Sequence, residues 1–174
     1  TANSADAEGS LLRGFADGVV FEGGTSWGGG FAFRARLVTT LAGSNFRIGF
    51  CDSVAIAAPT VGIYVSGDAG VLQLVTMSSH GNVGDDVEHV STLTAGTTMV
   101  VDTWHDFKVT WEGNNAQGGP QWVELTIDGE VAASLFCVID NDETAEMKIF
   151  HWQDTGGAAT RIFEIDYFEY WQFR

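Results

Sequence analysis

The sequence predicts an all-β fold, a two-sheet antiparallel β-sandwich. Short stretches in which apolar and polar residues alternate recur along the chain, and no helical pattern interrupts them. The 22 glycines, two prolines, 12 phenylalanines and six tryptophans among 174 residues suit many short strands joined by tight turns. Because a strand that is apolar on one face must cover that face, two sheets packed face to face are expected in a single domain.

The stretch from Trp104 to Val131 predicts a three-strand meander. Residues Trp104–Glu112 and Gln121–Ile127 both alternate with a period of two, which is typical of strands buried on one face. Between them, the glycines, asparagines and proline of residues 113–120 can reverse the chain. Asp128-Gly129 then suits a two-residue hairpin turn.

The remaining strands are expected from the same pattern, about a dozen to fourteen in all. They are Leu11–Phe15, Val19–Glu22, Phe31–Leu37, Asn45–Cys51, Val61–Val65, Val71–Met77, Val87–Leu93, Thr97–Val101, Ser134–Ile139, Met147–Trp152 and Arg161–Phe173. We expect one sandwich domain over residues 10–174. Residues 1–9 are small, polar and acidic, so we expect them to form a flexible N-terminal arm.

The net charge of −15, from 23 acids and eight bases, argues against partners that carry phosphate. An acidic surface repels nucleic acid and anionic membranes, so neither is expected as a partner. No apolar run approaches the ~18 residues of a membrane span, and no export signal is visible at the start. Without a secretory context, Cys51 and Cys137 are expected to be buried free thiols.

Several side chains are candidates for contact with a ligand or a partner. The glycine-rich run Gly23–Gly30 lacks the Gly-Lys-Ser/Thr ending of a phosphate-binding loop and predicts a turn around Trp27. Trp27 and Trp122 are the candidates for stacking on a sugar. A cationic stripe would form from three arginines if their strands were neighbours, whereas pairing with acids on adjacent strands is the alternative. These are Arg34, Arg36 and Arg47.

Three segments together resemble the concanavalin A-like lectin/glucanase superfamily. They are the strand Trp104-His-Asp-Phe-Lys-Val109, the strand that ends in Ile127-Asp-Gly129, and the closing strand Ile165-Asp-Tyr-Phe168. The chain is most similar to the domains of this type in virion proteins of tailed bacteriophages, over residues 31–174. The resemblance implies a twisted jelly roll with its termini close together. This fold hosts lectins, hydrolases, lyases and structural modules alike.

Glu164, Asp166 and Glu169 have the Glu-x-Asp-x-x-Glu form of the retaining glucanases with this fold. The resemblance implies a nucleophile at Glu164, a modulating acid at Asp166 and an acid/base at Glu169. A one-residue bulge would be needed to bring the three acids to one face, with two carboxyl groups about 5–5.5 Å apart. The glucanases carry this motif in mid-chain, whereas only five residues follow it here. We therefore expect solvent-facing acids on a terminal strand.

Asp140 and Asp142 lie in an acidic turn that offers oxygen ligands to calcium, as some related modules do. Consecutive polar residues lack the alternate-position pattern of a calcium loop, so a solvated turn is expected. The histidines show no metal-ligand spacing. We expect neither a metal nor a cofactor.

The resemblance and the lack of a convincing catalytic set favour a non-enzymatic structural protein of a phage particle. It would be a capsid decoration or cement protein that stabilises the head, located in a virion assembled in the host cytoplasm. Its partners would be the major capsid protein or other virion subunits, with a homotrimer implied by the resemblance. The candidate contact residues are Thr1, Ala2, Asn3, Arg34, Arg36 and Arg47. A lectin-like module that binds a glycan is the alternative, and a glycoside hydrolase is the third hypothesis.

Overall fold

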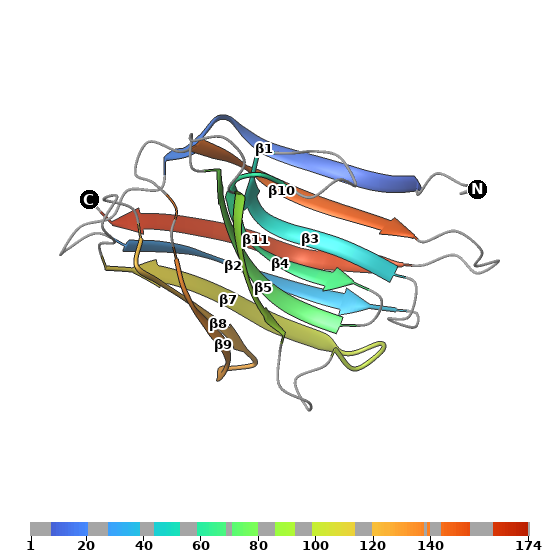
Figure 1. The fold of residues 1–174 in the computed structure, drawn as a ribbon. Coiled ribbons are helices and arrows are strands. Elements are labelled where there is room, and N and C mark those ends of the chain that lie inside the picture. Colours follow the sequence, from blue (N-terminus) through green and yellow to red (C-terminus); the bar gives the residue numbers. More distant parts are fainter. Residues whose placement is uncertain are drawn as a thin grey trace.

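The computed structural model shows two antiparallel sheets packed face to face, which confirms the predicted sandwich (Figure 1). It describes residues 8–20, 28–38, 44–52, 59–68, 71–79, 86–92, 99–113, 120–137, 139, 144–153 and 162–173. No helix in these ranges is long and apolar enough to cross a membrane.

One sheet has six strands in the order β1-β10-β3-β4-β5-β6, and the other has five in the order β11-β2-β7-β8-β9. The strands of the six-stranded sheet are β1 (Glu8–Val20), β3 (Ser44–Cys51), β4 (Gly62–Asp68), β5 (Val71–Ser79), β6 (Asp86–Thr92) and β10 (Thr144–Gln153). Those of the five-stranded sheet are β2 (Gly28–Leu37), β7 (Trp104–Glu112), β8 (Trp122–Ile127), β9 (Glu130–Phe136) and β11 (Phe163–Phe173).

The structure differs from the predicted strands near the start and before the meander. The two strands expected over residues 11–22 are, as far as residue 20, the single strand β1, whose pairing with β10 shifts register between Gly14 and Val19. Val100 lies outside any strand, because its N–H donates to the His105 Nε2 at 2.9 Å instead of to a ladder. The prediction of a strand over Thr97–Val101 is therefore wrong for residues 99–101, the part of it that the structure describes.

The ends of the chain also differ from the expectation. Residues 1–7 lie outside the described residues, and Glu8 and Gly9 of the predicted arm already belong to β1. The start of β1 and the end of β11 lie at opposite ends of the sandwich, not close together (Figure 1).

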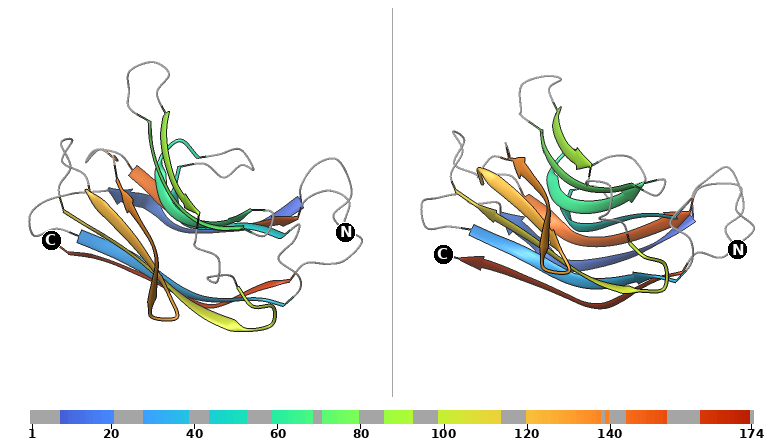
Figure 2. Two further views of the ribbon diagram at one scale, coloured as in Figure 1. Left: turned by 60° about the horizontal axis from the view of Figure 1, so that its bottom comes forward. Right: turned by 90° about the horizontal axis from the view of Figure 1, so that it is seen from below.

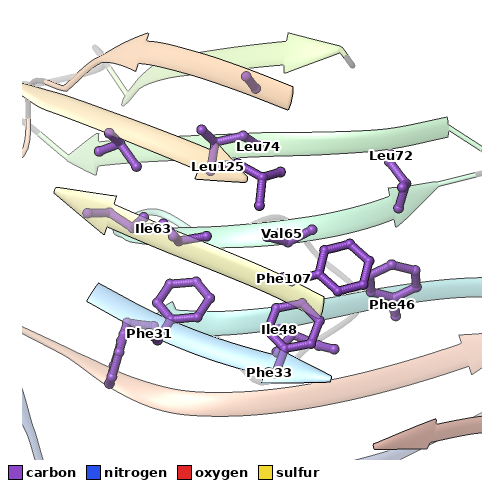
Figure 3. Close-up of a cluster of buried hydrophobic side chains, with 14 of the residues drawn as sticks. Phe31, Phe33, Phe46, Ile48, Ile63, Val65, Leu72, Leu74, Phe107 and Leu125 are labelled. Carbon is purple, nitrogen blue, oxygen red and sulfur yellow. The ribbon is translucent and has the colours of Figure 1, made fainter. Parts of the chain in front are cut away.

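Aromatic side chains from both sheets fill the space between them (Figure 3). Phe33 of β2 faces its register partner Phe107 of β7, with stacked rings whose centroids are 4.6 Å apart. Phe31 meets Phe50 of the opposite sheet edge-on, at a centroid distance of 5.8 Å. Such pairs add to the burial of apolar area, so the core holds the two sheets together.

The glycines at the start of β2 make room for two indole rings. A Cβ atom on Gly29 would lie 2.6 Å from the Trp111 ring, and one on Gly30 would lie 2.5 Å from the Trp171 ring. Any larger residue would displace these rings. The turn predicted over Gly23–Gly30 is therefore wrong for Gly28–Gly30, because these three glycines are buried strand residues.

The predicted hairpin turn at Asp128-Gly129 is confirmed, with φ angles of 53° and 87°. The Asp128 carboxylate accepts hydrogen bonds from the Asp106 N–H at 2.9 Å and from the His105 Nδ1 at 2.6 Å. The His105 Nε2 accepts the Val100 N–H, so the ring proton lies on Nδ1 and points to Asp128. One carboxylate thus ties the turn to the segment before β7.

Replacing Asp128 by Asn tests this contact. Burial alone would raise the pKa of Asp128, but the hydrogen bonds from Asp106 and His105 outweigh burial and lower that pKa. The carboxylate therefore adds to the free energy of unfolding at pH values above the pKa of an unfolded aspartate, about 3.9. This contribution is lost as the pH falls through the lower pKa of Asp128 in the folded protein. We expect Asp128→Asn to lower the free energy of unfolding by about 1 kcal/mol at pH 7, and by less at pH 3.

Urea denaturation at pH 3 and at pH 7 measures the loss of unfolding free energy at each pH. Asp166→Asn is the control, because its exposed carboxylate lies 3.9 Å from Arg34 in a surface ion pair of small energetic value. A deficit for Asp128→Asn that is the same at pH 3 and pH 7 would contradict the assigned role of the charge.

Candidate functional site: the outer face of the six-stranded sheet

The six-stranded sheet presents a second organised face on the side away from the core. Phe46, Ile48 and Phe50 of β3 point into the core, so the alternate residues of this strand point outward. We call the outer side the concave face, because the strands of this sheet curve toward it (Figure 2). Its described side chains are Asn45, Arg47, Cys51, Tyr64, Ser66, Val71, Gln73, Val75, Met77, Glu146, Lys148 and Phe150.

The concave face has a buried floor. Cys51, Tyr64, Val75 and Met77 form an apolar cluster that is separate from the main core, and Tyr64 is 3% exposed. The Tyr64 hydroxyl lies 3.7 Å from the Met77 sulfur. Burial raises the pKa of the Cys51 thiol to about 11, so this thiol is protonated and unreactive at neutral pH. Cys51 and Cys137 are both buried free thiols, as predicted.

Polar side chains surround this floor. Asn45, Ser66 and Lys148 are buried, whereas Arg47 and Gln73 are partly exposed. The Ser66 hydroxyl lies 3.4 Å from the Gln73 Oε1. The Arg47 guanidinium lies over the Tyr64 ring, 6.0 Å from its centroid. The accessible part of the face therefore offers hydrogen-bond donors and acceptors above an aromatic base.

Gly49 leaves the middle of the concave face without a side chain. Its register partners are Lys148 on β10 and Tyr64 on β4, so bare backbone separates these two residues. Its φ of 145° is one that L-residues rarely adopt, and a Cβ there would lie 2.5 Å from the Ile63 carbonyl oxygen. Glycine is therefore required at this position.

Lys148 is the buried charge of this face, with 2% of its side chain exposed. Its Nζ lies 3.7 Å from the Glu146 Oε2, and the Glu146 side chain is 38% exposed. Both residues alternate with Met147 and Ile149, which point into the core. The sequence signal for this site was a lysine between two core residues of one strand. We did not predict a site from that signal.

The three arginines of the proposed stripe lie on opposite sides of the sandwich. Arg34 and Arg36 belong to β2 in the five-stranded sheet, and Arg47 belongs to β3 in the six-stranded sheet. Arg34 pairs with Asp106 at 3.7 Å and Arg36 pairs with Asp102 at 3.1 Å. The cationic stripe therefore does not form. Arg34 and Arg36 instead pair with acids, which was the alternative prediction.

The acids of the glucanase-like motif lie on β11, an edge strand of the five-stranded sheet. A register shift between Ile165 and Tyr167 provides the bulge that the motif requires. On β2, the register partner of Glu164 is Arg36 and that of Glu169 is Ala32. These partners are four residues apart on β2, which is about 13 Å along a strand. The Glu164 carboxylate accepts hydrogen bonds from the Arg36 Nε at 2.9 Å and Nη2 at 2.5 Å. Glu164 is thus engaged by an arginine, while the side chains of Asp166 and Glu169 are exposed.

Trp122 lies on β8 of the five-stranded sheet, away from the concave face. It is 47% exposed and meets Phe136 edge-on at a centroid distance of 5.6 Å. The other candidates from the sequence lie outside the described residues. These are Trp27, Thr1, Ala2, Asn3, Asp140 and Asp142. Among the described residues, no group of three or more His, Cys, Asp or Glu side chains is placed to hold a metal ion.

Comparison with solved structures shows the same fold in glycan-active and glycan-recognising proteins. Alginate lyase A1-II′, of polysaccharide lyase family 7, is 14% identical, with a TM-score of 0.53 over 99% of this chain and 74% of the lyase. The Emp47p carbohydrate recognition domain is 10% identical, with a TM-score of 0.58 over 96% of this chain and 88% of that domain. No family model and no curated protein matches the sequence.

These neighbours correct the prediction that the chain is not an enzyme. The catalytic domain of an endo-1,3-β-glucanase (laminarinase) from Thermotoga petrophila is 16% identical, with a TM-score of 0.55 over 82% of this chain and 62% of that one. Like the alginate lyase, it is an enzyme built on this concanavalin A-like jelly roll. The fold is therefore shared by enzymes and lectins, and the architecture gives no ground for excluding catalysis.

Replacing Gly49 by Ala tests the requirement for glycine at this position of β3, because the added Cβ would lie 2.5 Å from the Ile63 carbonyl oxygen and 2.9 Å from the core ring of Phe31. Gly129→Ala is the matched control, since Gly129 also has a positive φ but nothing lies within 4 Å of an added Cβ. We expect Gly129→Ala to cost about 1 kcal/mol of unfolding free energy, from backbone strain alone. Gly49→Ala should cost about 3 kcal/mol or more, because strain and overlap with Ile63 add. Equal midpoints of thermal unfolding for the two variants would contradict the assigned role of Gly49.

Proposed function

We propose that this chain is a lectin-like domain that binds a glycan on the concave face. The observation that carries the proposal is the arrangement of partly exposed Arg47, Gln73 and Phe150 above a buried floor. Phe150 is the register partner of Arg47, so an aromatic ring and a guanidinium belong to neighbouring positions.

The chemistry of this face suits a sugar. A pyranose ring presents hydroxyl groups at its edge and C–H groups on its faces. The donors of Arg47 and the amide of Gln73 match the hydroxyl groups, and the Phe150 ring matches the C–H groups. Ligand sites of this kind combine an apolar base with a few well-placed polar groups. The carbohydrate recognition domain among the structural neighbours supports the same class of ligand.

The capsid decoration hypothesis stays a prediction. The structural neighbours are glycan-active enzymes, a carbohydrate recognition domain and a toxin binding domain, so they give no support to a virion role. The expected capsid partners, the homotrimer and the virion location rest on the sequence resemblance alone. The arm residues proposed to contact the capsid lie outside the described residues.

A glycan array followed by calorimetric titration of the bound glycans tests the proposal. We expect Arg47→Ala to weaken binding at least tenfold, because the variant loses a charged donor at the ligand, and tenfold corresponds to about 1.4 kcal/mol. Trp122→Ala is the control, since Trp122 lies on the other sheet. It should leave the dissociation constant unchanged.

Two outcomes would contradict the proposal. If no glycan on the array binds, the lectin-like function is wrong. If Trp122→Ala abolishes binding while Arg47→Ala does not, a glycan is bound but on the five-stranded sheet. The tryptophan site predicted from the sequence would then replace the concave face.

A further inference from the structure

A short segment before β7 is fastened to the sandwich by a histidine side chain. We call residues 99–103 the strap, because they cross from the core to the surface and lead directly into β7. Met99 at the start of the strap is buried in the main core. The next two side chains, Val100 and Val101, are 58% and 45% exposed. The strap therefore presents two neighbouring valines to the solvent.

The backbone of the strap makes a tight turn with one strained residue. The Thr103 N–H donates to the Val100 carbonyl oxygen at 3.1 Å, which closes a four-residue turn. Asp102 in this turn has a φ of 59°, which residues other than glycine seldom adopt. Its N–H donates to the Leu37 carbonyl oxygen at 2.8 Å, and its carboxylate lies 3.1 Å from the Arg36 guanidinium. Such a conformation persists only where surrounding contacts hold it.

The His105 imidazole holds the other end of the strap. Its Nε2 accepts the Val100 N–H at 2.9 Å, and its Nδ1 donates to the Asp128 carboxylate at 2.6 Å. A neutral imidazole has one donor and one acceptor, and both are used here. The hydrogen bond from Val100 therefore exists only while His105 is neutral.

Protonation of His105 acts in opposite directions on these two hydrogen bonds. An imidazolium carries N–H on both nitrogens, so Nε2 no longer accepts and two N–H groups point at each other. The bond to Asp128 then joins two charged groups, and charge-assisted hydrogen bonds are about twice as strong as neutral ones. A single proton thus breaks the bond to the strap and strengthens the bond to the turn after β8.

The charged side chains linked to His105 through the described contacts belong to the strap, β2, β7 and the turn after β8. They are Asp102, Arg34, Arg36, Asp106 and Asp128. Burial alone would raise the pKa of Asp128, but the hydrogen bonds to its carboxylate outweigh burial and lower that pKa. Asp128 is therefore ionised between about pH 5 and pH 8, where histidines ordinarily titrate. The surrounding charges set the pH at which the ring takes up its proton, but they cannot restore an acceptor to an imidazolium.

We propose that His105 is a pH-sensitive switch that holds the strap at neutral pH and releases its Val100 end in mild acid. The sandwich stays folded, because the protonated ring remains paired with Asp128 and the pair of Asp102 with Arg36 is untouched. Release moves Val100 and Val101, so acid changes the apolar surface at this end of the domain. The switch is independent of the proposed glycan site.

Amide hydrogen exchange of the full chain, followed by NMR between about pH 7.5 and about pH 5, tests the switch. After correction for the pH dependence of exchange in an unfolded peptide, we expect protection of the Val100 amide to fall about tenfold or more. The fall should follow the titration of the His105 ring nitrogens, read from their chemical shifts. The Asp106 amide is the internal control, because it donates to Asp128 and not to the histidine. Its protection should stay constant or rise.

Replacing His105 by Gln removes the titration. The glutamine amide offers one acceptor for Val100 and a donor for Asp128 without any change of charge. Protection of the Val100 amide should then be the same at both pH values. His151→Gln is the matched control, because it makes the same substitution on β10 of the other sheet. It should keep the acid-dependent loss of protection.

Four outcomes would overturn the proposal. Protection of Val100 that stays constant while the His105 nitrogens titrate would show that the proton does not control the strap. Equal losses at Val100 and Asp106 would mean that the whole turn opens. A ring that stays neutral until the domain unfolds would leave no switch in the folded protein. Persistence of the acid-dependent loss in His105→Gln would assign it to another group. If that variant does not fold, the titration of the parent chain still decides among the first three outcomes.

Discussion

The packing of aromatic rings between the two sheets is the interaction on which the rest of the structure depends. Phe31 and Phe33 of β2 contact Trp111 and Phe107 of β7 within one sheet, and Phe31 reaches Phe50 of the other. These rings take up the inner faces of both sheets, so the polar residues of the same strands are left on the outer faces. The buried cluster around Tyr64 on the concave face is thus an addition to the fold and does not hold the two sheets together.

Much of the fold could be predicted from local patterns. The meander over β7, β8 and β9 follows from strict alternation and from Asp128-Gly129, because both signals lie within a few residues. The expected strand Thr97–Val101 failed for a tertiary reason, since the Val100 N–H is taken by a histidine side chain. Alternation detects which residues are able to form a strand. It does not detect where their backbone hydrogen bonds go.

The candidate site was harder to predict because it depends on which strands become neighbours. β2 and β3 are consecutive in sequence, yet they lie in different sheets, and this separates Arg47 from Arg34 and Arg36. Lys148 and Tyr64 flank Gly49 on either side of β3 although 84 positions separate them in the sequence. A single sequence contains no signal for such pairing. The motif of Glu164 was visible, but its ion pair with Arg36 required the register of β11 on β2.

The position of β10 has a consequence for the way the protein forms. This strand, Thr144–Gln153, lies between β1 and β3, which are both made far earlier in synthesis. While the chain is being made, β1 and the β10-facing edge of β3 have no partner strand, and open strand edges favour association with other chains. Sheet formation with contacts this distant in sequence is slow. The concave face, whose Lys148 and Glu146 arrive on β10, is therefore assembled only after β10 itself has been made.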